Sequence, residues 1–196
     1  MLKLGLTGSI ATGKSTVLQV FADLGVPTFS SDAAVHELYE GEGATALAPV
    51  FPAVVHGGKV DRAALGRWLV AHPSDLPKLE AIIHPLVRRR MAGFLAEATA
   101  TGAPVTVVDI PLLFETGFDY GLDAVVVTTV DEATERARAL ARPGMTVEKL
   151  DTILARQMPQ AEKRARATYV IDTSGPILET EAEVRALYAR LVAPPT

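Results

Sequence analysis

An α/β fold built on a parallel sheet is predicted by two features of this 196-residue sequence. Short runs rich in β-branched residues alternate with longer segments whose apolar residues recur at helical spacing. The strand candidates are residues 2–6, 26–29, 105–110, 124–130 and 169–171. Because strands separated by helices pair in parallel through crossover connections, we expect a five-stranded parallel sheet as the core.

Individual segments refine this prediction. The run at 105–108 is almost continuously apolar or β-branched, which is typical of a strand covered on both faces, so it should lie near the sheet centre. A first helix is expected from Ser15 to about Leu24, where Gly25 suits the left-handed turn after a helix. A last helix should close the chain before Pro194-Pro195, which we expect to form a frayed tail.

Two long inserts interrupt the alternation. Residues 32–98 read as mostly helical. Residues 136–166 carry eight Lys or Arg against three acids, a local charge of 8 − 3 = +5 in a chain of net charge −4, so the remainder sums to −9. Such segregation predicts a basic lid over a polyanion. The alternative is an ordinary solvated helix face.

Composition limits the class of protein. A net charge of −4 with 21% charged residues does not fit a polybasic nucleic-acid binder, so no nucleic-acid partner is expected. The absence of cysteine excludes disulfides, thiolate catalysis and Cys-ligated zinc. No apolar run approaches the ~20 residues of a membrane span, and no leader-like segment precedes the first strand. We therefore expect a cytoplasmic protein with no membrane association. The sequence leaves the oligomeric state open, with a monomer favoured.

A phosphate-binding loop is the strongest motif. Residues 8–15 read Gly-Ser-Ile-Ala-Thr-Gly-Lys-Ser, which fits G-x-x-x-x-G-K-[S/T] between a predicted strand and a predicted helix. Gly8 and Gly13 allow backbone N–H groups to approach phosphate oxygens, and the helix start adds its positive dipole end. Lys14 would reach the β and γ phosphates and Ser15 would ligate Mg²⁺. The sequence thus predicts a P-loop NTPase fold that binds Mg-ATP.

Two carboxylates follow predicted strands, where ligands of α/β folds bind. Asp32 could accept the proton of an acceptor hydroxyl, but it also precedes a plausible helix and could be its N-cap. Asp109 ends the strongest strand and is placed like a carboxylate that holds Mg²⁺, with a turn-capping role before Pro111 as the alternative. Both assignments stay open at this point.

Several motifs together resemble the dephospho-CoA kinase family over nearly the whole chain. They are the phosphate loop, Asp32 with His36, Ile83-His84-Pro85, Asp109-Ile110-Pro111-Leu112-Leu113-Phe114-Glu115, and Val170-Ile171-Asp172, in that order. The phosphate loop is generic, but the Pro-Leu-Leu-Phe-Glu and His-Pro strings are far more restrictive. The resemblance implies ATP-dependent phosphorylation of the ribose 3′-hydroxyl of dephospho-coenzyme A, the last step of coenzyme A biosynthesis.

The resemblance also implies roles for single residues. Asp32 looks like the catalytic base, and Lys14 and Arg138 like catalytic groups that offset charge on the transferred phosphoryl group. Asp109 joins Ser15 as a metal ligand. The ATP contacts implied are Gly8, Ala11, Thr12, Gly13, Lys14, Ser15, Thr16 and Arg142. The dephospho-CoA contacts implied are Asp32, His36, Arg62, His84, Arg88 and Glu115.

Some of these residues could have a purely structural role instead. His84 stands before a proline at the end of an apolar helical face and could simply bond a backbone carbonyl. Arg88, Arg89 and Arg90 cannot all face one ligand from successive helical positions. The chain also departs from the family pattern at Ser30, where an acid is usual, and in the turn at 172–175, where Asn is frequent.

The resulting domain assignment has three parts. Residues 1–31, 99–135 and 167–196 would form the nucleotide-binding core, residues 32–98 the helical acceptor domain, and residues 136–166 the lid. Another P-loop small-molecule kinase, of nucleoside monophosphate or shikimate type, is the alternative within enzymes. A nucleotide-dependent switch protein is the alternative outside them.

Overall fold

The computed structural model describes residues 1–193, and these fall into two compact units. Residues 1–29 together with those from 98 onward form the larger unit, and Ser30–Glu97 form the smaller one. The division places the first insert in a unit of its own, whereas the basic second insert belongs to the larger unit. The tail at Pro194-Pro195 lies outside the described residues.

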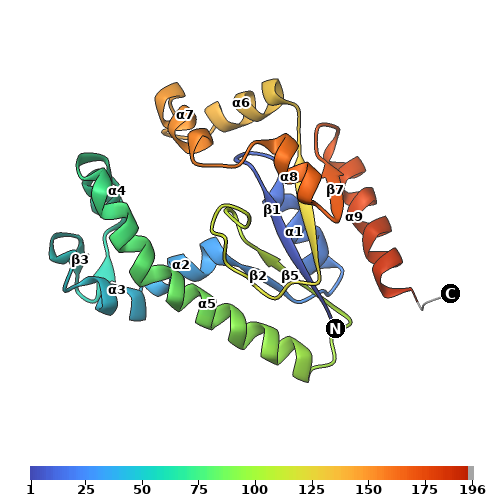
Figure 1. Ribbon diagram of the computed structural model, residues 1–196, viewed down its shortest axis with the longest axis horizontal. Coiled ribbons are helices and arrows are strands. Elements are labelled where there is room, and N and C mark those ends of the chain that lie inside the picture. Colours follow the sequence, from blue (N-terminus) through green and yellow to red (C-terminus); the bar gives the residue numbers. More distant parts are fainter. Residues whose placement is uncertain (194–196) are drawn as a thin grey trace. The chain divides into compact units, whose positions relative to one another are not determined.

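The larger unit contains the predicted five-stranded parallel sheet (Figure 1). Its strands are β1 (Leu2–Gly8), β2 (Thr28–Ser30), β5 (Val105–Asp109), β6 (Ala124–Thr129) and β7 (Tyr169–Asp172). They lie in the order β2-β5-β1-β6-β7, and β1 pairs in parallel with β5 and β6, as β6 does with β7. The fold class expected from the sequence is confirmed. The strand at 105–109 is fully buried, beside the central strand β1.

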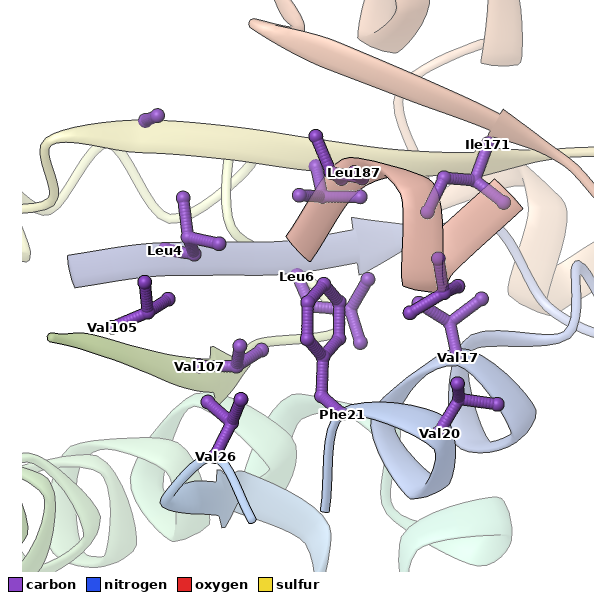
Figure 2. Close-up of a cluster of buried hydrophobic side chains, with 13 residues drawn as sticks. Leu4, Leu6, Val17, Val20, Phe21, Val26, Val105, Val107, Ile171 and Leu187 are labelled. Atoms are coloured by element: carbon purple, nitrogen blue, oxygen red, sulfur yellow. The ribbon is translucent and has the colours of Figure 1, made fainter. Parts of the chain in front are cut away.

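One face of the sheet carries the main apolar core (Figure 2). Helices α1 (Lys14–Asp23) and α9 (Ile177–Val192) pack on it with alternate residues of the strands, because side chains at i and i+2 of a strand share a face. The buried members include Leu4, Leu6, Val17, Val20, Phe21, Val105, Val107, Ile171, Val184 and Leu187. This packing fixes the start of α1 directly after the end of β1.

The second insert forms three short helices of the larger unit. They are α6 (Glu132–Leu140), α7 (Val147–Ala155) and α8 (Gln160–Arg166). The N-caps of α6 and α7 are Asp131 and Thr146, whose side chains accept from Thr134 N–H and Lys149 N–H. Their sequence pattern therefore explains where the first two helices begin.

The smaller unit is helical with one hairpin. Its helices are α2 (Ser31–Tyr39), α3 (Glu42–Leu47), α4 (Arg62–Ala71) and α5 (Leu76–Ala100), joined by 3-10 turns at Pro52–Val54 and Pro73–Asp75. Strands β3 (Val55–His56) and β4 (Lys59–Val60) form a hairpin that the sequence analysis did not predict. Gly57 and Gly58 both have positive φ, and a Gly-Gly pair flanked by Val-His and Lys-Val is the signal that could have revealed it.

Helix α5 continues through Pro85, so His84 does not lie at the end of a helix. Proline removes one backbone hydrogen bond and clashes with the preceding turn, at a cost of about 3 kcal/mol. Buried Leu79, Ile83, Val87 and Met91 recur every four residues on both sides of it. The continuous apolar stripe offsets the local cost. Within residues 1–193, neither α5 nor any shorter helix has the length and apolar character of a membrane span.

Two leucines of α9 allow a matched test of the core. Leu187 is 1% exposed and Leu178 is 72% exposed. We expect Leu187→Ala to lower the free energy of unfolding by about 2–5 kcal/mol, because it leaves a cavity under the sheet. Leu178→Ala should change it by less than about 0.5 kcal/mol. Urea unfolding of both variants checks this, and equal losses would contradict the assignment of the core.

Candidate active site

The phosphate loop joins β1 to α1 through two left-handed residues. Ala11 has φ 61 and Gly13 has φ 77, and Gly13 is the N-cap of α1. A Cβ on Gly8 would lie 2.9 Å from the carbonyl oxygen of Thr128 on β6, so only glycine fits between the strands there. The positive φ of Ala11 is costly for a residue with a Cβ, and such strain is found mainly at functional sites.

Threonine hydroxyls form hydrogen bonds with the backbone of this loop. Thr12 Oγ1 donates to the carbonyl of Ser9 at 2.9 Å or pairs with Thr128 Oγ1 at 2.7 Å. Thr173, in the turn after β7, places its Oγ1 3.1 Å from the carbonyl of Thr12. Because threonine hydroxyls donate hydrogen bonds to the loop carbonyls, the loop conformation suits N–H groups that bind a phosphate ligand.

The structure brings together Lys14 and Asp109, two of the predicted site residues. Lys14 Nζ, from the first turn of α1, lies 3.2 Å from Asp109 Oδ1 at the end of β5, and both side chains are largely buried. Since β5 and β1 are neighbours, the carboxylate reaches the phosphate loop at the carboxyl edge of the sheet. Ser15 follows Lys14 and is exposed. This edge therefore offers a cation and a hydroxyl from the first turn of α1 and a carboxylate from the end of β5.

The basic insert contacts the loop directly. Ile10 N–H donates to Gln157 Oε1 at 3.0 Å, and Ala11 packs with Ala139 and Leu150 of α6 and α7. Arg138 of α6 donates from Nη2 to the carbonyl of Thr173 at 2.8 Å and from Nη1 to its hydroxyl at 3.3 Å. Arg142, beyond the end of α6, is exposed. Arg138 is thus held near the loop, while the position of Arg142 leaves its side chain in solvent.

One of the eight cations of this insert is not a surface residue at all. Lys163 of α8 has 0% exposure, and its Nζ lies 2.8 Å from Glu115 Oε1. Glu115 also accepts from Met158 N–H at 2.8 Å. Burial alone would raise the pKa of Glu115, but hydrogen bonds from Lys163 and from Met158 N–H hold it below its ordinary value. Glu115, predicted as a substrate contact, has one oxygen engaged inside the larger unit, and its substrate role stays a prediction.

A second carboxylate completes this buried cluster. Glu135 of α6 is 4% exposed and accepts from Gln160 Nε2 at 2.8 Å, while Gln160 Oε1 accepts from Val130 N–H at 3.2 Å. Burial raises the pKa of Glu135, and the hydrogen bond from Gln160 and the charge of Lys163 only partly offset this. Glu135 is therefore the member of the cluster that takes up a proton first as the pH falls.

In the smaller unit, Asp32 lies in the first turn of α2 and is exposed. The alternative in which Asp32 caps this helix is wrong, because Ser30 is the N-cap and its Oγ accepts from Ala33 N–H at 3.3 Å. Ser30, where the family usually has an acid, thus has a structural role in this chain, since serine is among the best N-cap residues. Asp32 has its carboxylate available for another role.

The smaller unit also joins two predicted acceptor contacts. Arg62 Nη1 lies 3.0 Å from His36 Nδ1. Arg90 pairs with Glu37 at 2.6 Å and Arg89 with Glu42, so two of the three successive arginines form ion pairs with neighbouring helices of this unit. Arg88 and Glu80 lie near His84, and burial lowers the pKa of that imidazole. The structure therefore groups His36 with Arg62 and places His84 separately in mid-helix.

The sequence did not predict the structural roles of four residues: Ser30, Gln157, Lys163 and Thr173. Ser30 could have been found, because serine followed by a helical pattern is an N-cap signal. The other three act through contacts with residues far away in sequence, and no local pattern marks them.

The fold and the site define the class of the P-loop kinases. The larger unit has the parallel sheet and the strand–loop–helix phosphate site of that class, with the lysine of the loop beside a carboxylate at the end of a neighbouring strand. The fold is similar to that of a shikimate kinase from Bacteroides thetaiotaomicron, with a TM-score of 0.54 at 19% identity, covering 98% of this chain and 99% of the other. That likeness concerns the fold alone.

The chain belongs to the dephospho-CoA kinase family, whose sequence profile matches residues 2–179. Curated dephospho-CoA kinases from Rhodopseudomonas palustris and Rhizobium etli are each 52% identical to it, over 95% and 97% of this chain and 94% of their own length. The protein TT1252 of Thermus thermophilus, a solved structure, has a TM-score of 0.81 at 34% identity and 98% coverage of both chains. The resemblance found in the motifs is confirmed, and the chain is a phosphotransferase.

The buried cluster predicts a pH dependence of stability. The folded state binds a proton at Glu135 more readily than the unfolded chain, so this group favours folding at acidic pH and loses that contribution as the pH rises above its ordinary pKa of 4.5. Glu135→Gln leaves Lys163 and Glu115 as a balanced pair. We expect it to raise Tm at pH 7.5, with the gain shrinking toward zero near pH 4.5.

Thermal unfolding across that pH range checks the expectation. Glu132→Gln is the matched control, because Glu132 lies in the first turn of the same helix and is exposed. A gain that does not depend on pH, or an equal gain for both variants, would show that Glu135 is not the group responsible.

Proposed function

We propose that this chain transfers the γ-phosphoryl group of ATP to the ribose 3′-hydroxyl of dephospho-coenzyme A, yielding coenzyme A and ADP. The observation that carries the proposal is the Lys14–Asp109 pair beside the phosphate loop, in a chain that matches dephospho-CoA kinases over almost its full length. The bond from the γ-phosphorus to its bridging oxygen breaks as the bond to the 3′-oxygen forms.

The roles of the residues in the larger unit follow from charge. The N–H groups of the loop at 11–16 and the start of α1 would bind the phosphates, and Lys14 would offset charge on the β and γ groups. Arg138, and Arg142 from its exposed position, would add fork-shaped contacts to phosphate oxygens. One side of the loop is covered by an apolar cluster that helps to exclude water; its members are Leu150, Ala139 and Ala11.

Magnesium is the metal that this donor set fits. Within residues 1–193 no cluster of three or more His, Cys, Asp or Glu forms a protein cage for an ion. Mg²⁺ takes few protein ligands and keeps water and phosphate oxygens, so the Ser15 hydroxyl and the Asp109 carboxylate are a sufficient pair. When bound, it would neutralise charge on the phosphate oxygens.

The smaller unit would supply the acceptor side. Asp32, not used as a helix cap, would take the proton of the 3′-hydroxyl. His36 and Arg62 form a polar pair that could bind anionic groups of the acceptor, and His84, Arg88 and Glu115 are the remaining proposed contacts. The residues 32–98 would then act as the acceptor domain and 136–166 as the lid, in a cytoplasmic monomer.

The acceptor is tested by coupled ADP release from Mg-ATP with dephospho-coenzyme A, AMP, shikimate or no acceptor. We expect strong stimulation by dephospho-coenzyme A alone. Stimulation by AMP or shikimate would favour another small-molecule kinase, and tight nucleotide binding without acceptor-dependent turnover would favour a switch protein.

The base is tested by Asp32→Asn. We expect ATP affinity to stay within about two-fold while turnover falls by roughly 10²–10⁴-fold, because a positioned general base contributes a factor of that size. The control is Asp23→Asn, the same change at the far end of α1 from the phosphate loop. Unchanged turnover in Asp32→Asn would remove Asp32 from the mechanism.

A further inference from the structure

Thr173 lies where three segments of the larger unit meet. It follows β7, is 4% exposed, and donates its N–H to the carbonyl of Thr129 at 2.9 Å. Its Oγ1 lies 3.1 Å from the carbonyl of Thr12 and 3.3 Å from that of Thr129. A hydroxyl carries one proton, so it can serve one of these carbonyls at a time, and the shorter distance favours the phosphate loop.

The same side chain packs against the left-handed end of that loop. A Cβ on Gly13 would lie 3.2 Å from Cβ, Cγ2 and Oγ1 of Thr173. The threonine side chain therefore packs against the last residue of the loop, where α1 begins. Its hydroxyl and its methyl group both support the stretch that presents Lys14.

Thr173 also receives both ends of the Arg138 guanidinium. Nη2 donates to its carbonyl at 2.8 Å and Nη1 to its hydroxyl at 3.3 Å. Arg138 comes from α6, so a single buried residue links the basic insert to the phosphate loop. Removing the hydroxyl would leave the carbonyl of Thr12 without this donor and Arg138 with one contact in place of two.

We propose that Thr173 is a positioning residue for nucleotide binding. Its hydroxyl donates a hydrogen bond to the Thr12 carbonyl, which keeps the loop N–H groups facing the phosphates. Thr173 also fixes the direction of the Arg138 side chain. The inference rests on the proposed use of ATP and deepens it, because it assigns the shape of the phosphate site to a residue that need not touch the nucleotide.

The test compares three threonine variants by calorimetric titration with MgADP, with no acceptor present. We expect Thr173→Val to weaken MgADP binding by about 5- to 10-fold, the effect of losing one buried hydrogen bond. Thr173→Ser keeps the hydroxyl and should bind within about two-fold of the wild type. Thr106→Val is the matched control, since Thr106 donates to the carbonyl of Pro27 at 3.1 Å, outside the loop.

A cycle with Arg138→Ala tests the link to the basic insert. In the wild-type background this change should weaken MgADP binding about 10-fold, and in the Thr173→Val background by less than about 3-fold, because the arginine is already misplaced. Additive effects would overturn the link. Thermal unfolding of each variant, measured beside the titrations, separates affinity from folding.

The outcomes distinguish this inference from the proposed function. Wild-type protein that binds no MgADP would count against the use of ATP itself. Wild-type protein that binds MgADP, with Thr173→Val binding equally well or weakened no more than Thr106→Val, would overturn the positioning role alone. Loss in Thr173→Val with recovery in Thr173→Ser would support it.

Discussion

The larger unit depends on one constraint: the loop at 8–15 must turn from the end of β1 into α1 and leave the N–H groups at the start of the helix for a phosphate. Two left-handed residues and a glycine packed against β6 make this turn possible. Carbonyls that point away from the ligand need hydrogen-bond donors, and the hydroxyls of Thr12 and Thr173 provide them. The parallel sheet supplies the frame, because Asp109 ends β5 beside β1, and Thr173 follows β7 at the same edge of the sheet.

The basic insert turns out to have two kinds of cation. Lys163 is buried between carboxylates and anchors α8 to the segment that ends in Glu115, whereas Arg138 reaches toward the phosphate loop. A net charge of +5 in the sequence does not separate these uses. A buried ammonium needs a paired carboxylate, so the charge of Lys163 has a structural use. The cations left for a polyanion are the arginines of the insert and the exposed Lys149.

The smaller unit shows how apolar burial overrides local preference. Helix α5 accepts Pro85 because its apolar stripe continues on both sides, and a serine in place of the usual acid begins α2 with a good cap. The cap leaves the neighbouring carboxylate of Asp32 exposed in the first helical turn, where it is stabilised by the helix dipole. A departure from the family pattern thus keeps the feature on which the proposed chemistry relies.

The sequence by itself determined the phosphate loop, the five strands of the parallel sheet and the family, because these follow from short-range patterns of glycine, apolar spacing and motif order. Only the tertiary structure decided what Thr173, Lys163 and Gln157 do. Their partners lie 161, 48 and 147 residues away in the chain, counted from Thr12, Glu115 and Ile10. A contact between distant segments arises from packing of the whole sheet, so no local sequence pattern could have predicted it.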